Sequence, residues 1–235
     1  MPLSTRPRAV VFDVNETLSD TTALRRRLDG LGAPAGAVHS RFLPSVLRDG
    51  FARTFAGEPV PFRQVAEDVL RADLGARGVR EHLDRAVDAA VEFALGAFGE
   101  FTVHPDVPAG VRRLHGAGLD LVAFTNGSAH ECESLLERAG LREDFSHVLS
   151  VEETGPWKPH PDAYAHVLRV CDLAAGEALF TAVHPWDLDG AARAGFATAW
   201  LDRDGRPYPS ASPAPSLVAT GVDALAEAVL AAPAR

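Results

Sequence analysis

The stretch Arg8–Asp20, RAVVFDVNETLSD, decides the fold that we expect for this chain. Four apolar residues, Ala9–Phe12, run without a polar break and end at Asp13. A short apolar, β-branched run is typical of a strand buried on both faces of a parallel sheet. Ligands of such sheets bind at the carboxyl ends of the strands, so Asp13 is a candidate catalytic carboxylate and Thr17 could hydrogen-bond a bound anion. The alternative is that Asp13 only caps a turn.

The overall composition indicates a globular protein with a sizeable core, because 46% of the 235 residues are hydrophobic. A net charge of −9 argues against nucleic acid as a partner but leaves room for a small anionic substrate near local basic residues. Cys132 and Cys171 show no CxxC spacing, so we expect reduced thiols and neither disulfide nor zinc site. No apolar run resembles a signal peptide or a membrane span, so we expect a soluble cytoplasmic protein.

The rest of the chain changes character twice. From Leu18 to Phe98 the apolar spacing predicts helices and no strand, as in a small lid inserted after the first strand. From Pro105 onward, strands alternate with helices, which is typical of an α/β fold. The strands expected there are Leu119–Phe124, His147–Val151, Leu179–Val183 and Ala197–Leu201. The helices expected between them are Ser128–Ala139, Ala163–Cys171 and Leu188–Ala194.

Three later loops carry polar residues that could act together with Asp13. Thr125 and Asn126 lead from a strand into a helix, where they could bind an anion or simply cap the helix. Lys158 lies among three prolines that would fix its backbone, although a lone lysine is more often a surface residue. Asp187 begins a helix, as either an N-cap or a catalytic carboxylate.

In this order, Asp13, Thr125-Asn126, Lys158 and Asp187 resemble the four motifs of the haloacid dehalogenase superfamily of aspartate-nucleophile hydrolases. The resemblance covers nearly the full chain. It implies a Rossmann-like α/β core with a parallel sheet and an all-helical cap inserted after the first strand. On this basis we expect the core to comprise residues 1–17 and 99–235, and the cap residues 18–98.

Two positions bear on the branch of the superfamily. Most members transfer phosphoryl groups with magnesium, using an Asp two residues after the nucleophile and an acidic residue four before the last aspartate. Here these positions hold Asn15, whose amide cannot act as an acid, and Val183. Because magnesium prefers carboxylate oxygens, phosphoryl transfer is disfavoured. We expect no cofactor, and magnesium only if the protein is a phosphatase after all.

Other residues resemble the metal-independent (S)-2-haloacid dehalogenase branch. Trp186-Asp187 matches its Trp-Asp pair, and Tyr164 follows Lys158 at its spacing. Asn126-Gly127-Ser128 also resembles its second motif. The branch therefore implies that Tyr164 and Trp186 lie at the substrate site.

The resemblance also implies roles for residues in the cap. Phe62 lies where the branch places an apolar pocket residue. The arginine that holds the substrate carboxylate would be Arg41 or Arg48, because the alignment is ambiguous around Pro44. A homodimer is suggested by the resemblance alone.

Four positions depart from the branch and leave the substrate open. The departures are Asn15 in place of an aromatic residue, Glu16 in place of Gly, Ala182 in place of Ser, and His184 in place of Asn. Asn15 and His184 remain candidates for substrate contact.

Together these features predict hydrolytic dehalogenation of a small 2-haloalkanoic acid through an aspartyl ester. Asp13 would attack the halogen-bearing carbon and Lys158 would pair with Asp13, while Asp187, aided by His184 or Asn126, would activate the water. One alternative is a phosphatase acting on a small phosphate ester. Another is a non-catalytic protein that binds a small anion or a partner.

Overall fold

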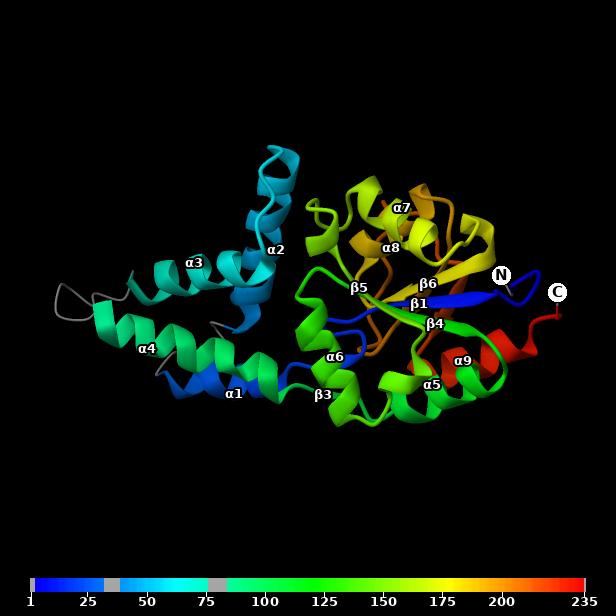
Figure 1. Cartoon of the computed structure of the whole chain (residues 1–235), viewed down its shortest axis with the longest axis horizontal. Coiled ribbons are helices and arrows are strands. Elements are labelled where there is room, and N and C mark those ends of the chain that lie inside the picture. Colours follow the sequence, from blue (N-terminus) through cyan, green and yellow to red (C-terminus); the bar gives the residue numbers. More distant parts are fainter. Residues whose placement is uncertain (1–2, 32–38, 76–83, 235) are drawn as a thin grey trace. The chain divides into compact units, whose positions relative to one another are not determined.

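The computed structural model describes residues 3–31, 39–75 and 84–234. The chain folds into two compact units, one made of Met1–Ser19 and Val103–Arg235 and the other of Asp20–Thr102 (Figure 1). Segments 32–38 and 76–83 of the expected cap lie outside the described residues.

The first unit is built on a six-stranded sheet with the strand order β5-β4-β1-β6-β7-β8. The strands are β1 Ala9–Asp13, β4 Asp120–Thr125, β5 His147–Ser150, β6 Ala178–Ala182, β7 Ala197–Leu201 and β8 Leu217–Ala219. All five pairings are parallel, and β1 lies between β4 and β6, with Val11 opposite Val122 and Phe180. The predicted α/β class is confirmed, and Asp13 ends a completely buried central strand.

Helices cover both faces of this sheet. They are α5 Val107–Gly116, α6 Ala129–Arg138, α7 Pro161–Val170, α8 Pro185–Arg193 and α9 Val222–Ala231. Short 3-10 helices lie at Arg142–Asp144, Val151–Glu153 and Ala175–Glu177. Figure 1 shows α7 and α8 on one face and α5, α6 and α9 on the other. This alternation of strand and helix directs the carboxyl ends of the parallel strands toward one edge.

Helix α8 begins earlier than the apolar pattern predicts. We expected the helix to span Leu188–Ala194 with Asp187 at its start, but it begins at Pro185 and His184 is its N-cap residue. Proline is favoured at the first helical position because its missing N–H has no intrahelical partner there. Asp187 therefore lies inside the first turn, where its side chain is completely buried.

The second unit is mainly helical. It contains α1 Thr22–Gly30, α2 His39–Phe55, α3 Phe62–Gly75, α4 Asp84–Leu95 and the 3-10 helix Gly96–Glu100. Its core includes an edge-to-face contact of Phe62 with Phe98, whose ring centroids are 6.0 Å apart. The expectation of no strand after Leu18 is wrong at one point, because the two-residue strands β2 Ser19–Asp20 and β3 Thr102–Val103 form a small sheet. A two-residue strand is too short to show an alternating pattern.

None of the helices in the described part of the chain combines the length and the hydrophobicity needed to cross a membrane.

Candidate active site

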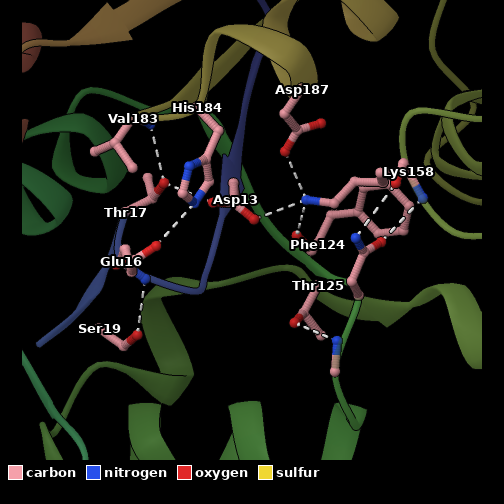
Figure 2. Close-up of polar contacts among 12 residues, drawn as sticks. Asp13, Glu16, Thr17, Ser19, Phe124, Thr125, Lys158, Val183, His184 and Asp187 are labelled. Carbon is pink, nitrogen blue, oxygen red and sulfur yellow. Dashed lines mark hydrogen bonds and ion pairs between the residues drawn. The ribbon is translucent and has the colours of Figure 1, made fainter. Parts of the chain in front are cut away.

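Three ionic side chains from distant parts of the sequence meet at the end of β1. The Lys158 Nζ donates hydrogen bonds to Asp13 Oδ1 at 2.7 Å and to Asp187 Oδ2 at 2.8 Å (Figure 2). It also donates to the Phe124 carbonyl at 3.1 Å. The exposed fractions of the three side chains are 0% for Lys158, 5% for Asp13 and 0% for Asp187. The loops singled out in the sequence thus bring a lysine between two carboxylates in a nearly dry environment.

The charge of Lys158 is stabilised by its partners. Burial alone disfavours a charged ammonium, but Asp13 and Asp187 outweigh it and raise the pKa of Lys158. The ammonium also lies 5.1 Å from the ring centroid of Phe124, a cation–π distance. Lys158 is the only lysine of the chain. We conclude that Lys158 is protonated and positively charged in this site at physiological pH.

Asp187 has a second firm partner in Tyr164. The Tyr164 hydroxyl donates to Asp187 Oδ1 at 2.7 Å and contacts the Asp187 carbonyl at 3.0 Å. Burial, and then the charge of Asp187, raise the pKa of Tyr164 well above its usual range, so the phenol keeps its proton. Burial also raises the pKa of Asp187, against the attraction of Lys158.

A glycine allows the close approach of Tyr164 to helix α8. A Cβ at Gly190 would collide with the Tyr164 hydroxyl and would lie 2.8 Å from the Pro159 Cβ. Gly190 is thus required for the contact that fixes Asp187.

The loop after β4 positions the lysine. The Lys158 amide donates to Asn126 Oδ1 at 2.9 Å, and Asn126 Nδ2 donates to the Lys158 carbonyl at 3.4 Å. The Thr125 hydroxyl accepts a hydrogen bond from the Gly127 amide at 2.9 Å. We expected Thr125 and Asn126 to bind an anion or cap a helix. In the structure, helix α6 has Ser128 as its N-cap residue, and the side chain of Asn126 holds the backbone of Lys158. Anion binding by this loop stays a prediction.

Thr17 holds the second oxygen of Asp13. Its hydroxyl donates to Asp13 Oδ2 at 2.6 Å and accepts from the Val183 amide at 3.1 Å. The Thr17 carbonyl accepts from Arg203 at 2.8 Å, and Arg203 pairs with Asp106 at 2.8 Å. Sequence reasoning missed Arg203 and Asp106. The one available signal was that Arg203 closely follows the predicted strand Ala197–Leu201.

Two of the departures from the family pattern contact each other. His184 Nε2 lies 3.4 Å from Glu16 Oε2, and the His184 ring stacks on Trp186 with centroids 5.3 Å apart. Glu16 adopts a left-handed backbone with φ 63°. Its amide donates to Ser19 Oγ at 3.2 Å, and its carbonyl lies 3.1 Å from His104 Nε2. The sequence analysis identified both substitutions but not their contact.

Four residues that the sequence analysis proposed for substrate contact have not yet been placed: Asn15, Arg41, Arg48 and Phe62. Asn15 is half-buried in the loop after β1, and a Cβ at Gly127 would be 3.8 Å from its Nδ2. Arg41, Arg48 and Phe62 belong to the second unit, where Arg48 Nε pairs with Asp49 Oδ1 at 2.7 Å and Phe62 is buried.

Acidic, histidine and cysteine side chains do not gather in threes as a metal site anywhere in residues 3–31, 39–75 and 84–234. Burial raises the pKa of Cys132 to about 12 and that of Cys171 to about 11. Both thiols are therefore protonated at neutral pH and poor metal ligands.

Comparisons with known proteins show which sequences and structures this chain is similar to. Residues 7–195 match the family model of the haloacid dehalogenase-like hydrolases. An (S)-2-haloacid dehalogenase from Pseudomonas sp. (strain YL) is 28% identical over 222 residues, covering 94% of this chain and 93% of that protein. Another, from Xanthobacter autotrophicus, is 30% identical over 200 residues, covering 83% of this chain and 75% of that protein. The crystal structure of the L-2-haloacid dehalogenase RSc1362 matches with a TM-score of 0.86 and 28% identity, covering 97% of this chain and 100% of that one. The chain belongs to the haloacid dehalogenase-like hydrolases, the family that the order of its four motifs predicts.

Proposed function

We propose that this hydrolase removes halide from a small 2-haloalkanoic acid through an ester formed on Asp13. The observation that carries the proposal is the fixed Asp13 carboxylate at the end of the central strand. Thr17 holds one of its oxygens and Lys158 the other, so the carboxylate is oriented for attack. The similarity to 2-haloacid dehalogenases over most of the chain supports this substrate class.

The first step is a displacement at carbon. An oxygen of Asp13 forms a bond to C2 of the substrate, and the carbon–halogen bond breaks with its electron pair leaving on the halide. This step needs no acid, because a halide leaves as a stable anion when N–H groups or cations receive it. Arg41 or Arg48 would hold the substrate carboxylate or receive the halide.

The second step hydrolyses the ester. Water adds to the carboxyl carbon of Asp13, and the products are a 2-hydroxy acid and free Asp13. Lys158 stays close to the reacting carboxyl group throughout, held by Asp187, Asn126 and, through Asp187, by Tyr164. The attacking water must lose a proton, for which Asp187 and His184 are the candidates at this edge of the sheet.

Neither step requires a cofactor. We propose a metal-independent enzyme with a small anionic substrate and with no nucleic-acid or membrane partner. The homodimer and the cytoplasmic location suggested by the sequence stay part of the same proposal.

Magnesium-dependent phosphoryl transfer does not suit these residues. The group between the two carboxylates is the Lys158 ammonium, which bonds to both. The position of the acid that would protonate a phosphate leaving group holds the amide of Asn15. The position of the acidic residue that would help to hold magnesium holds the alkyl group of Val183.

The proposal is tested by measuring halide release from a panel of 2-haloacids, with and without chelator. We expect the wild type to release halide and 2-hydroxy acid equally with and without chelator. Asp13→Asn should lower the rate at least about a thousandfold, because a covalent nucleophile is lost while the shape is kept. After a single turnover in ¹⁸O-water, the label should be found in Asp13 and not in the product.

Asp120→Asn is the matched control, because Asp120 begins the neighbouring strand β4 and is exposed. It should leave the rate unchanged. Magnesium-dependent hydrolysis of a phosphate ester without any halide release would contradict the proposal.

A further inference from the structure

Asp187 is poorly placed to take a proton from water. Its side chain is completely buried, Oδ2 accepts from Lys158 at 2.8 Å and Oδ1 accepts from Tyr164 at 2.7 Å. Protonation would remove the charge that pairs with Lys158. These contacts suit a residue that holds the lysine in place, and they leave the water without an obvious base on this side of Asp13.

A second acid–base pair, Glu16 and His184, lies on the other side. The side chains keep exposed fractions of 36% and 19%, so solvent reaches them. Within the described part of the chain, Nε2 is the ring nitrogen with a polar partner, the Glu16 carboxylate at 3.4 Å. A carboxylate at this distance stabilises, by its charge, the imidazolium that forms when an imidazole takes a proton.

The residues next to Glu16 and His184 in the sequence are connected by hydrogen bonds to Asp13. Val183 precedes His184, and its amide donates to the Thr17 hydroxyl, which donates to Asp13 Oδ2. Glu16 immediately precedes Thr17. Figure 2 shows Glu16, Thr17 and His184 on one side of Asp13 and the lysine on the other.

We propose, on the basis of the function proposed above, that His184 is the general base for ester hydrolysis and that Glu16 is its positioning residue. The water oxygen bonds to the Asp13 carboxyl carbon while His184 Nδ1 takes the water proton. The tetrahedral intermediate then collapses, breaking the bond from this carbon to the oxygen on substrate C2. That oxygen takes the proton back from His184, which yields the 2-hydroxy acid and a neutral imidazole. The other proton of the water remains on the Asp13 carboxyl group, which releases it to solvent and becomes a carboxylate again.

The two departures from the family pattern support a joint role. The resemblance places Gly and Asn at positions 16 and 184, and neither residue can form a charged acid–base pair. Here Glu16 occupies a left-handed conformation that favours glycine, and its carboxylate meets His184. A pair with a shared function accounts for both substitutions at once.

A rapid-quench experiment with (S)-2-chloropropionate separates the two steps by measuring halide and hydroxy acid independently. We expect His184→Gln to release one equivalent of halide per site at close to the wild-type rate. Ester hydrolysis should then be about a hundred- to ten-thousand-fold slower, the usual loss when a general base is removed. Intact-mass spectrometry should show an adduct on the peptide that carries Asp13.

A double-mutant cycle tests whether the pair acts as a unit. Glu16→Gln should slow ester hydrolysis less than His184→Gln does, with an unchanged halide burst. The double variant should be no slower than His184→Gln alone, because Glu16 acts only through the imidazole. Additive losses would contradict the positioning role of Glu16.

The control is His166→Gln, which removes another His–Glu pair of the same unit, with His166 Nε2 3.1 Å from Glu153 Oε2. It should leave both steps unchanged. His184→Asn, with the residue that the family pattern places there, repeats the test should the Gln variant not fold. Wild-type ester hydrolysis in a folded His184 variant, or equal slowing of both steps, would overturn the proposal. A wild type that releases no halide at all would instead contradict the proposed function and, with it, this assignment.

Discussion

The two sides of the Asp13 carboxylate differ in their access to water. On one side Lys158, Asp187 and Tyr164 are buried and bonded to one another. On the other side Glu16 and His184 are partly exposed. Displacement of a halide benefits from fixed charges in a dry environment, whereas ester hydrolysis requires water. The difference suggests that the two chemical steps are served by different sides of one carboxylate.

The largest effect should come from replacing Lys158 on the buried side of Asp13, which Lys158, Asp187 and Tyr164 form. Lys158→Met leaves two buried carboxylates without their cation, which typically lowers the free energy of unfolding by about 3–5 kcal/mol. We expect halide release to be lost as well, because the orientation of Asp13 depends on this contact. Urea denaturation at pH 7 and halide assays test both effects. Retention of wild-type stability would show that the ion pairs contribute little.

A smaller effect is expected at Tyr164. Tyr164→Phe removes the donor to Asp187 Oδ1 and leaves this buried oxygen without it, at a cost of about 1–3 kcal/mol in unfolding free energy. Both chemical steps should slow together, because the change reaches Asp13 only through Asp187 and Lys158. The same stability and rapid-quench measurements apply.

The chain offers a matched control for this change. Its other tyrosine, Tyr208, has a buried hydroxyl without a hydrogen-bond partner among the described residues. Tyr208→Phe should therefore be close to neutral for stability and rate. A comparable loss in both variants would mean that packing, and not the bond to Asp187, determines the effect.

The smallest change in stability should come from a substitution on the partly exposed side of Asp13, which Glu16 and His184 form. Glu16→Gly relieves a left-handed backbone at a residue with a side chain, which is worth about 1 kcal/mol. We expect thermal stability to be unchanged or slightly higher while ester hydrolysis becomes slower. Thermal melts followed by circular dichroism measure the first, and hydroxy-acid formation the second. A clear loss of stability would indicate that Glu16 serves the fold.

Five strands of the six-stranded sheet were predictable because each contains a short apolar run. The run Ala197–Leu201 is strand β7, and Leu119–Phe124 differs from β4 by one residue at each end. The meeting of Asp13, Lys158 and Asp187 could be expected because each follows a strand in the sequence, in an order that a known family shares.

Contacts between distant loops could not be predicted in the same way. The pairing of Glu16 with His184, and of Arg203 with the Thr17 carbonyl, depends on which strand ends are neighbours in the sheet. An apolar run predicts a strand but does not give its place in the order β5-β4-β1-β6-β7-β8. The apolar pattern does not show where α8 begins, because the first turn starts at Pro185 and contains the polar residue Asp187.

The solitary lysine of this chain has a consequence for chemical labelling. Amine reagents attack the neutral amine, and Lys158 is both buried and held in its protonated form by two carboxylates. In the folded protein such reagents should therefore leave Lys158 unmodified. Modification of Lys158 then reports that its surroundings have opened, so one mass shift on one peptide can follow the exposure of the Asp13–Lys158–Asp187 cluster during unfolding.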